Sequence, residues 1–411
     1  SLDLLPLPWA SDGDAGDREL AFGIHQMLGE RLSADASLRS ADPLRVNRAL
    51  AELGYDASAA DRQHQRVLDV MGAQRALEGE VRRDSGGWML KARLVNPASA
   101  TPLWSAEKHV SNESDMPAAL TALLAGLGPQ LGKSAIDIGW PTAEELRALG
   151  SASHLDVATV DVDALRTEAQ RFHNPELWWQ LLYRLDRGGR SAEAIDLAGA
   201  ARDDMKANDS TDARRTLAYA QTLLGDPGAA LSVLAERTSR VPNDHPARLL
   251  QARCEAELGN HDAAIRQLQA LVGDDPRNID AWYALGKYSI QAGDAKLAVD
   301  EYLVRAEVLA NRLNDKSMRA DVSHAYGIGY RRLGQMEAAA DQLRRAVSQR
   351  EALGDRRGQA ASLRNLSTVL SMQGMFDPAE AALNQAREIT EALGDSRALA
   401  DLANAKGALD E

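Results

Sequence analysis

The spacing of apolar residues divides the chain into an amino-terminal part with strand-like runs and a longer part with helical periods. In the first part, apolar runs bounded by polar turns predict strands, at residues 2–7, 75–83, 87–96 and 102–110. Apolar residues that recur every three or four positions predict helices, at about 17–34, 43–53, 59–72 and 115–131. Residues 1–135 are therefore expected to form a small α/β domain whose last three strands make a meander.

The longer part repeats itself. A glycine that ends a helical run returns at steps of 36, 34, 34, 41 and 40 residues, at Gly189, Gly225, Gly259, Gly293, Gly334 and Gly374. An alanine, small enough to let two antiparallel helices approach, follows each glycine by five residues, at Ala194, Ala230, Ala264, Ala298, Ala339 and Ala379. This period predicts an α-solenoid of about six helix pairs over residues 173–411.

The last repeats are longer than the first. The word Glu-Ala-Leu-Gly-Asp occurs at 351–355 and again at 391–395, a spacing of 40 residues. We expect longer second helices in these repeats, and a closing helix over 396–409, because an open solenoid end exposes apolar surface. Residues 136–172 are expected to be a helical connector, with a capping box at 142–145.

These repeats resemble the tetratricopeptide repeat over about 175–395, with Trp282-x-x-Leu285-Gly286 as one of its characteristic words. The resemblance implies a right-handed array of antiparallel helix pairs and a role in binding proteins or peptides.

Three short stretches near the start resemble the TolB-amino-terminal-like domain: Leu-Leu-Pro-Leu-Pro-Trp-Ala-Ser at 4–11, Gly-Ala-Gln-Arg-Ala-Leu-Glu-Gly-Glu-Val at 72–81, and Leu103-Trp104 after the turn at 94–99. This resemblance covers about residues 1–130. It implies a domain order seen in bacterial signalling proteins, where such domains precede tetratricopeptide arrays and follow an effector domain and a membrane helix. The effectors include Ser/Thr protein kinases, adenylate cyclases and winged-helix regulators.

Composition narrows the function. Aromatic residues are only 4% of the chain, which favours helix packed on helix over a sheet-rich core. The net charge of −13 is spread along the chain and argues against a nucleic-acid or anionic-membrane surface. The single cysteine, Cys254, cannot form an internal disulfide and leaves the compartment open.

The sequence contains no convincing motif for a nucleotide, metal or catalytic site. The glycines of 126–134 have the wrong spacing for a phosphate-binding loop and are more typical of a helix end. Asp12, Asp14 and Asp17 depart from a calcium loop and are expected to form a solvated turn. The eight histidines lack metal-ligand spacing, and no nucleophile or kinase motif occurs. We therefore expect no catalytic, cofactor or metal site, and expect Cys254, Trp178, Trp179 and Trp282 to lie in the core.

What remains is the inner surface, which the first helix of each repeat lines in such arrays. The phase of the repeats predicts the groove-facing positions in the last three repeats: Tyr283, Lys287, Gln291, His324, Ile328, Arg331, Arg332, Arg364, Asn365, Thr368 and Met372. Three arginines and a lysine among them suit a carboxylate or an acidic peptide. The alternative is a solvated face whose charges pair within the molecule.

The function expected from these features is a non-catalytic sensory region of a bacterial transmembrane protein, with a Ser/Thr kinase upstream and a periplasmic location. The start within an apolar run suggests a piece of a longer chain. The expected partners are a protein or peptide ligand in the groove, with an acidic ligand as one alternative, and a second copy of the chain in a homodimer. The alternative is a cytoplasmic scaffold or the tail of a winged-helix regulator. A ligand-processing enzyme lacks any candidate acid/base pair.

Overall fold

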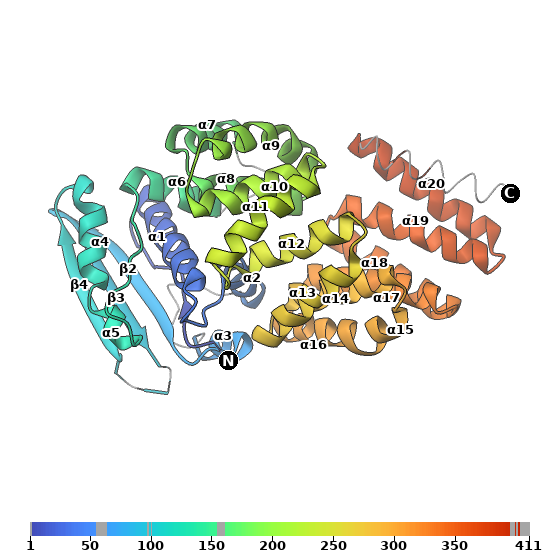
Figure 1. Cartoon of the computed structure of the whole chain (residues 1–411), viewed down its shortest axis with the longest axis horizontal. Helices are drawn as coiled ribbons and strands as arrows, with labels where there is room; N and C mark the ends of the chain where they lie inside the picture. Colours follow the sequence, from blue (N-terminus) through green and yellow to red (C-terminus); the bar gives the residue numbers. More distant parts are fainter. Residues whose placement is uncertain are drawn as a thin grey trace. The chain divides into compact units, whose positions relative to one another are not determined.

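The computed structural model describes residues 2–54, 64–96, 98–99, 101–153, 161–394, 399 and 402. The chain forms two compact units, Ser1–Cys254 and Glu255–Glu411, which are described separately (Figure 1). The first unit contains the α/β domain and the first repeats, so the predicted limits at 135 and 172 both fall inside it. Within the described ranges, no helix has the length and apolar character needed to span a bilayer.

The α/β domain has a sheet of four strands in chain order, β1 (Leu5–Pro6), β2 (Ala76–Asp84), β3 (Gly87–Val95) and β4 (Trp104–Val110). The last three strands form the predicted antiparallel meander, and β1 runs parallel to β2. The first strand is much shorter than the predicted 2–7. Beyond Leu5 and Pro6 the segment makes isolated bridges, such as Leu2 with Ala73, and single backbone hydrogen bonds, such as Leu7 N–H to the Leu77 carbonyl at 2.8 Å. Pro6 and Pro8 have no backbone N–H to donate to a longer ladder.

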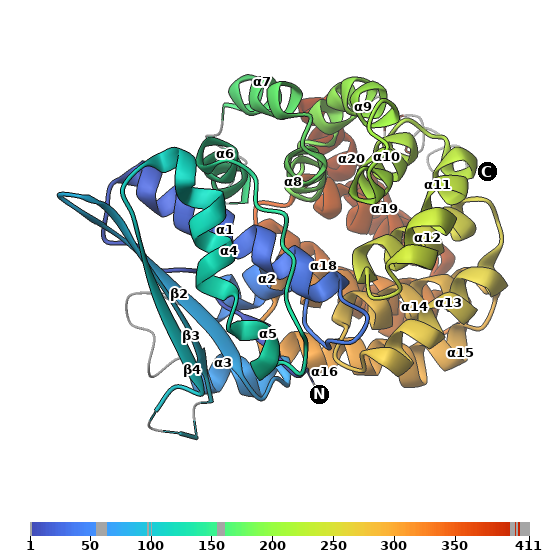
Figure 2. The ribbon, with the colours of Figure 1, turned by 60° about the vertical axis from the view of Figure 1, so that its left-hand side comes forward.

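Seven α-helices accompany this sheet within the described residues: α1 (Ala15–Ala34), α2 (Pro43–Leu53), α3 (His64–Met71), α4 (Met116–Leu124), α5 (Leu127–Gln130), α6 (Ala143–Ser153) and α7 (Val162–Phe172). Helix α1 lies against β2, and α4 lies against β3 and β4 (Figure 2). Alternate residues of β3 are buried, as expected for a sheet with one covered face. The predicted helix 115–131 is divided into α4 and α5, and the left-handed glycine that follows them is Gly132.

The prediction for Asp17 is wrong. Asp17 was expected in a solvated turn, but it lies in the first turn of α1 and its side chain is buried. Its carboxylate accepts hydrogen bonds from Trp88 Nε1 at 3.0 Å and from Arg83 Nε at 2.9 Å. Burial acts to raise the pKa of Asp17, but these two donors outweigh it and hold the pKa below its ordinary value. Asp14 caps the helix by accepting from the Asp17 amide.

Helices α1 and α6 cross at very short range. A Cβ atom on Gly23 of α1 would lie 2.6 Å from the carbonyl carbon of Leu146, and one on Gly150 of α6 would lie 2.7 Å from that of Glu19. The two glycines thus allow the backbones to touch. Helix α6, predicted as part of a connector, therefore packs directly against the first helix of the α/β domain.

The repeats form the predicted solenoid of antiparallel helices. In the first unit they comprise α8 (Pro175–Arg187), α9 (Ser191–Lys206), α10 (Thr211–Leu223), α11 (Pro227–Arg240) and most of α12 (His245–Glu257). In the second they comprise α13 (His261–Asp274), α14 (Ile279–Ala292), α15 (Ala295–Leu297), a π-helical turn η3 (Ala298–Tyr302), α16 (Leu303–Leu313), α17 (Lys316–Arg332), α18 (Met336–Ala352), α19 (Arg356–Met372) and α20 (Phe376–Leu393).

The repeat phase is confirmed residue by residue. The six glycines that recur once per repeat, from Gly189 to Gly374, are called the phase glycines, and the alanines five residues after them are called the phase alanines. All six phase glycines have positive φ angles between 75° and 100°, the left-handed conformation that ends a helix at little cost only for glycine. All six phase alanines are fully buried. The longer second helices are confirmed too, because α18 and α20 continue to the residues just before Gly354 and Gly394. The predicted closing helix at 396–409 and the repeat word's Asp395 lie outside the described residues, apart from Leu399 and Leu402.

Candidate functional site

The predicted groove residues all lie on the first helices of the last three repeats, within the second unit. Tyr283, Lys287 and Gln291 are on α14, the four residues from His324 to Arg332 are on α17, and the Arg364 group is on α19. These helices begin at strong caps. Asn278, Asp315 and Asp355 each accept a hydrogen bond from the backbone amide three residues later. Each cap fixes where its helix begins.

His324 is the point at which the three helices come together. Its Nδ1 lies 3.0 Å from the hydroxyl of Ser362 on α19. Burial lowers the pKa of His324 to about 3, with further lowering from the positive charges of Arg350, Lys287 and Arg364. Lys287 of α14 and Arg364 of α19 thus act on the same imidazole of α17. At neutral pH this imidazole is uncharged and serves as a hydrogen-bonding group.

Arg350, on the second helix α18, belongs to this cluster and was missed by the sequence. Its Nη1 donates to the Ser362 hydroxyl at 2.8 Å, and its Nη2 donates to Asp321 at 2.8 Å. Another bond from Nη1 reaches the Gly358 carbonyl at 2.7 Å. The signal for it was faint, because a lone arginine near the end of an amphipathic helix usually faces solvent. Arg350 holds α17, α18 and α19 together through these three bonds.

Arg331 and Arg332 behave differently from Arg350. Neither has an ion pair within the described part of the chain, and Arg331 Nε is buried without a hydrogen-bond partner. Burial, and then the neighbouring charge of Arg332, lower the pKa of Arg331. A guanidinium that loses water without gaining a carboxylate is unfavourable in the isolated chain. Arg331, with the exposed Arg332 beside it, therefore fits the expectation of a basic surface that an acidic ligand completes.

The remaining predicted residues have other surroundings. Asn365 and Thr368 bond to backbone carbonyls of their own helix, at 3.0 and 3.2 Å. Ile328 and Tyr283 pack against the apolar core of the unit, while Gln291 and Met372 are exposed.

The expected core residues are mostly where the sequence placed them. Trp178, Trp179 and Cys254 are buried. Trp282 is only partly buried against the core of the second unit, and its Nε1 donates to the Pro276 carbonyl at 2.9 Å. Its ring thus covers the core from the side rather than filling it.

Charge is distributed unevenly between the first and second helices. Helix α17 carries four basic residues and one acidic residue, and α19 carries three basic residues and none that is acidic. Helix α18 carries three of each, and α20 carries one basic and four acidic residues. The basic excess in an acidic protein is thus concentrated on α17 and α19, two of the three helices that hold the predicted groove positions.

The described residues contain no group of three or more His, Cys, Asp or Glu side chains placed to hold a metal ion. The chemistry that the cluster offers is hydrogen bonding and ion pairing, through guanidinium groups, an ammonium group and a neutral imidazole. Such groups suit the recognition of carboxylates.

The family model of the tetratricopeptide repeat matches residues 318–392, and a second model of the same repeat matches 224–278 and 249–311. The chain therefore contains tetratricopeptide repeats, a fold that is typically non-catalytic and that binds protein partners. The TolB-like resemblance of residues 1–130 stays a prediction. No curated protein matches the chain.

Solved structures similar to the chain include the anaphase-promoting-complex hetero-tetramer Cut9-Hcn1, at 16% identity and a TM-score of 0.48 over 70% of this chain and 51% of that one. The chain thus spans about half the length of that relative. A tetratricopeptide protein of Thermus thermophilus has 21% identity and a TM-score of 0.39, over 48% of this chain and 98% of that one. MamA of Desulfovibrio magneticus has 18% identity and a TM-score of 0.36, over 45% of this chain and 97% of that one.

Proposed function

We propose that the last three repeats bind an acidic segment of a protein or peptide along α14, α17 and α19. The observation that carries this proposal is the pair Arg331 and Arg332, whose guanidinium groups have no ion pair among the described residues. The basic excess of α17 and α19 supports the same ligand class, because it favours a chain of opposite charge.

The basic groups of these repeats would bind the carboxylates of the ligand in different ways. A carboxylate beside Arg331 supplies the partner that the buried Nε lacks, so binding removes a cost that the free protein carries. Arg364 and Lys287 supply further positive charge around the neutral His324. The bonds of Arg350 keep the helices in place, so the surface is formed before the ligand arrives.

We further propose that this ligand-binding region belongs to a bacterial transmembrane signalling protein, with a Ser/Thr kinase as the effector and the present chain in the periplasm. The support is the order of a region that resembles the TolB-amino-terminal-like domain followed by repeats, together with the absence of any candidate catalytic motif in the sequence. In this arrangement the α/β domain is nearest the membrane and relays binding, directly or through a homodimer.

Binding is tested with a fluorescently labelled oligo-glutamate peptide, with an oligo-glutamine peptide of equal length as the neutral probe. The double variant Arg331→Glu/Arg364→Glu should weaken oligo-glutamate binding roughly tenfold or more, because two attractive charges become repulsive. The matched control, Lys296→Glu/Arg344→Glu, makes the same change in net charge at exposed sites on second helices. Equal affinity in the two variants would show that the site lies elsewhere.

The signalling context has separate tests. Sequencing the gene upstream of Ser1 should reveal a membrane helix and an effector domain, and their absence would refute the transmembrane assignment. A fused reporter that is active only in the periplasm should be active in the full-length protein. An inactive reporter would favour a cytoplasmic scaffold. Light scattering of the purified chain measures its mass, and a mass of one chain would refute the homodimer.

A further inference from the structure

The groove positions of the first two repeats are already occupied. The residue ten positions before each phase glycine is a predicted groove position in the last repeats, where it is Tyr283, His324 or Arg364. In the first two repeats the same offset gives Trp179 on α8 and Arg215 on α10. Both are buried, and a carboxylate from helix α1 of the α/β domain reaches Arg215. All of these elements belong to the first compact unit.

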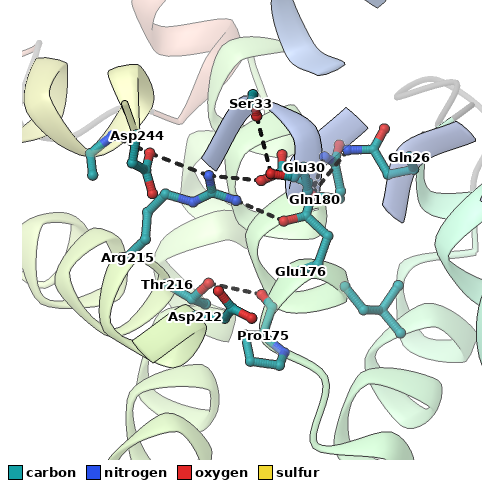
Figure 3. A network of polar contacts seen from close by, with 12 residues as sticks. Gln26, Glu30, Ser33, Pro175, Glu176, Gln180, Asp212, Arg215, Thr216 and Asp244 are labelled. Carbon is teal, nitrogen blue, oxygen red and sulfur yellow. Dashed lines mark hydrogen bonds and ion pairs between the residues drawn. The ribbon is translucent and has the colours of Figure 1, made fainter. Parts of the chain in front are cut away.

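Arg215 is the centre of the contact (Figure 3). Its guanidinium pairs with Glu30 of α1 at 3.1 Å, with Glu176 of α8 at 2.7 Å and with Asp244 at 3.4 Å. The guanidinium also lies over the ring of Trp179, 4.5 Å from its centroid. A carboxylate of α1 is thus held by an arginine that itself lies over an aromatic ring, and the arginine and the ring are at groove positions of two successive repeats.

Further polar contacts extend the same edge of α1. Arg31 pairs with Asp212 of α10 at 2.6 Å, and Gln26 donates to Glu176 at 3.1 Å. Beyond the helix end, Asn243 donates to the Asp35 carbonyl at 3.1 Å. The partners Glu176 and Asp212 stand thirteen residues before their phase glycines, so they too share one register of the repeats.

Helix α1 therefore has two unlike sides. Its apolar residues and Gly23 pack against the sheet and α6, where the helix backbones touch. The edge with Gln26, Glu30 and Arg31 meets the repeats through ion pairs and hydrogen bonds. Buried ion pairs add little net stability over apolar packing, because desolvation offsets most of their attraction. The second contact is the one suited to reversible opening.

We propose that helix α1 is an internal ligand of the groove formed by the first two repeats, held by a releasable ionic lock at Arg215, and that its release opens this part of the groove to an acidic helical partner. The lock consists of Glu30, Glu176, Arg215 and Asp244. The proposal is independent of the ligand assigned to the last repeats, because every residue in it lies in the first unit.

Within the lock, Glu30 is the residue that separates from Arg215 when α1 is released. Only one of its carboxylate oxygens is bonded to Arg215, and the other, Oε1, is buried without a hydrogen-bond partner among the described residues. Glu176, by contrast, also accepts from Gln180 at 2.6 Å, and Asp244 pairs with Arg237 at 2.7 Å and caps α12. Arg215 therefore keeps two carboxylates when α1 leaves.

Hydrogen exchange on the full chain tests the lock. Glu30→Arg, which places like charges together, should raise amide exchange roughly tenfold in the segments facing α1, namely 175–180, 211–217 and 241–244, with no change in β2, β3 or α6. Glu236→Arg is the matched control, because it breaks exposed pairs with Arg214 and Arg240 on the same repeats. Unchanged exchange, or a uniform rise through the sheet as well, would overturn the lock. Glu30→Gln repeats the test if the reversal prevents folding.

A labelled peptide of residues 15–34 tests the groove itself. In the wild-type chain the tethered α1 has an effective concentration near millimolar and should exclude the peptide. The Glu30→Arg chain should bind it roughly tenfold more tightly, and a peptide with Glu30→Gln should lose that gain. Equal binding by wild-type and variant chains would mean that α1 is a fixed part of the core rather than a ligand.

Discussion

The close crossing of α1 and α6 predicts that replacing glycine by alanine lowers the free energy of unfolding at this crossing and raises it at open helix positions. Replacing glycine by alanine inside a helix normally stabilises it by about 0.5–1 kcal/mol, because glycine loses more backbone entropy on folding. Gly199 of α9 and Gly273 of α13 have open space where a Cβ would be built. Gly199→Ala and Gly273→Ala should therefore raise the free energy of unfolding by about that amount.

Gly23→Ala and Gly150→Ala should have the opposite effect. Each new methyl would lie within 2.6–2.7 Å of a carbonyl carbon on the facing helix, and a backbone cannot yield by changing a rotamer. The helices must move apart, at an overpacking cost of about 1–3 kcal/mol that exceeds the gain in helix propensity. We expect a net loss of about 1–2 kcal/mol.

The assay is urea unfolding followed by circular dichroism, with the four variants measured beside the wild-type chain. Hydrogen exchange then shows whether the loss is concentrated in α1 and α6. If Gly23→Ala stabilised the protein as much as Gly199→Ala does, the close crossing would be refuted. A destabilised Gly199→Ala would instead show that the open-space argument fails for this chain.

Three further predictions concern packing and titration. Ala339→Leu or Ala379→Leu, at fully buried sites between helices, should cost about 1–3 kcal/mol in thermal or urea unfolding, and no loss would refute the repeat phase. Burial raises the pKa of Glu30 above its ordinary value, and the nearby carboxylates of Glu176, Asp244 and Asp42 act in the same direction against the charge of Arg215. The folded chain then binds this proton more tightly than the unfolded chain, so stability falls as pH rises above the ordinary pKa of a glutamate, and Glu30→Gln should flatten this slope by up to about 1.4 kcal/mol per pH unit. His324, with its pKa lowered to about 3, should show no imidazole titration by NMR between pH 5 and 8, where a shift near pH 6.5 would contradict its burial.

The periodic features of this fold were predictable because each follows from a local requirement. A helix end that needs positive φ selects glycine, and a close helix pair selects alanine, so the positions of Gly293 and Ala298 give the register of their repeat. The meander was predictable for the same reason, since its hairpin turn at 84–87 has a local signature.

The buried polar contacts were not predictable, because they depend on pairings between residues far apart in the chain. Asp17 looks like a turn residue from its neighbours, and only the approach of Trp88 and Arg83 makes it a buried acceptor. Arg215 looks like an ordinary surface arginine from its own helix, and only the approach of Glu30 on helix α1 makes it part of a buried charge cluster. Sequence periodicity predicts the contacts that a residue makes within its own helix pair. It does not predict contacts with residues of a separate domain.

The occupied groove bears on the ligand of the last repeats. Arg215 and Arg364 stand at the same offset from their phase glycines, and the repeat geometry gives that offset the same direction from one helix pair to the next. In the first unit, this position accepts a carboxylate presented by an α-helix. The chain thus contains its own example of the recognition proposed for Arg364 and Arg331, made in the same fold by the same residue type. An acidic helix is therefore a more specific expectation for the last repeats than an acidic extended peptide, and helical glutamate-rich peptides should bind them more tightly than proline-interrupted peptides of equal charge.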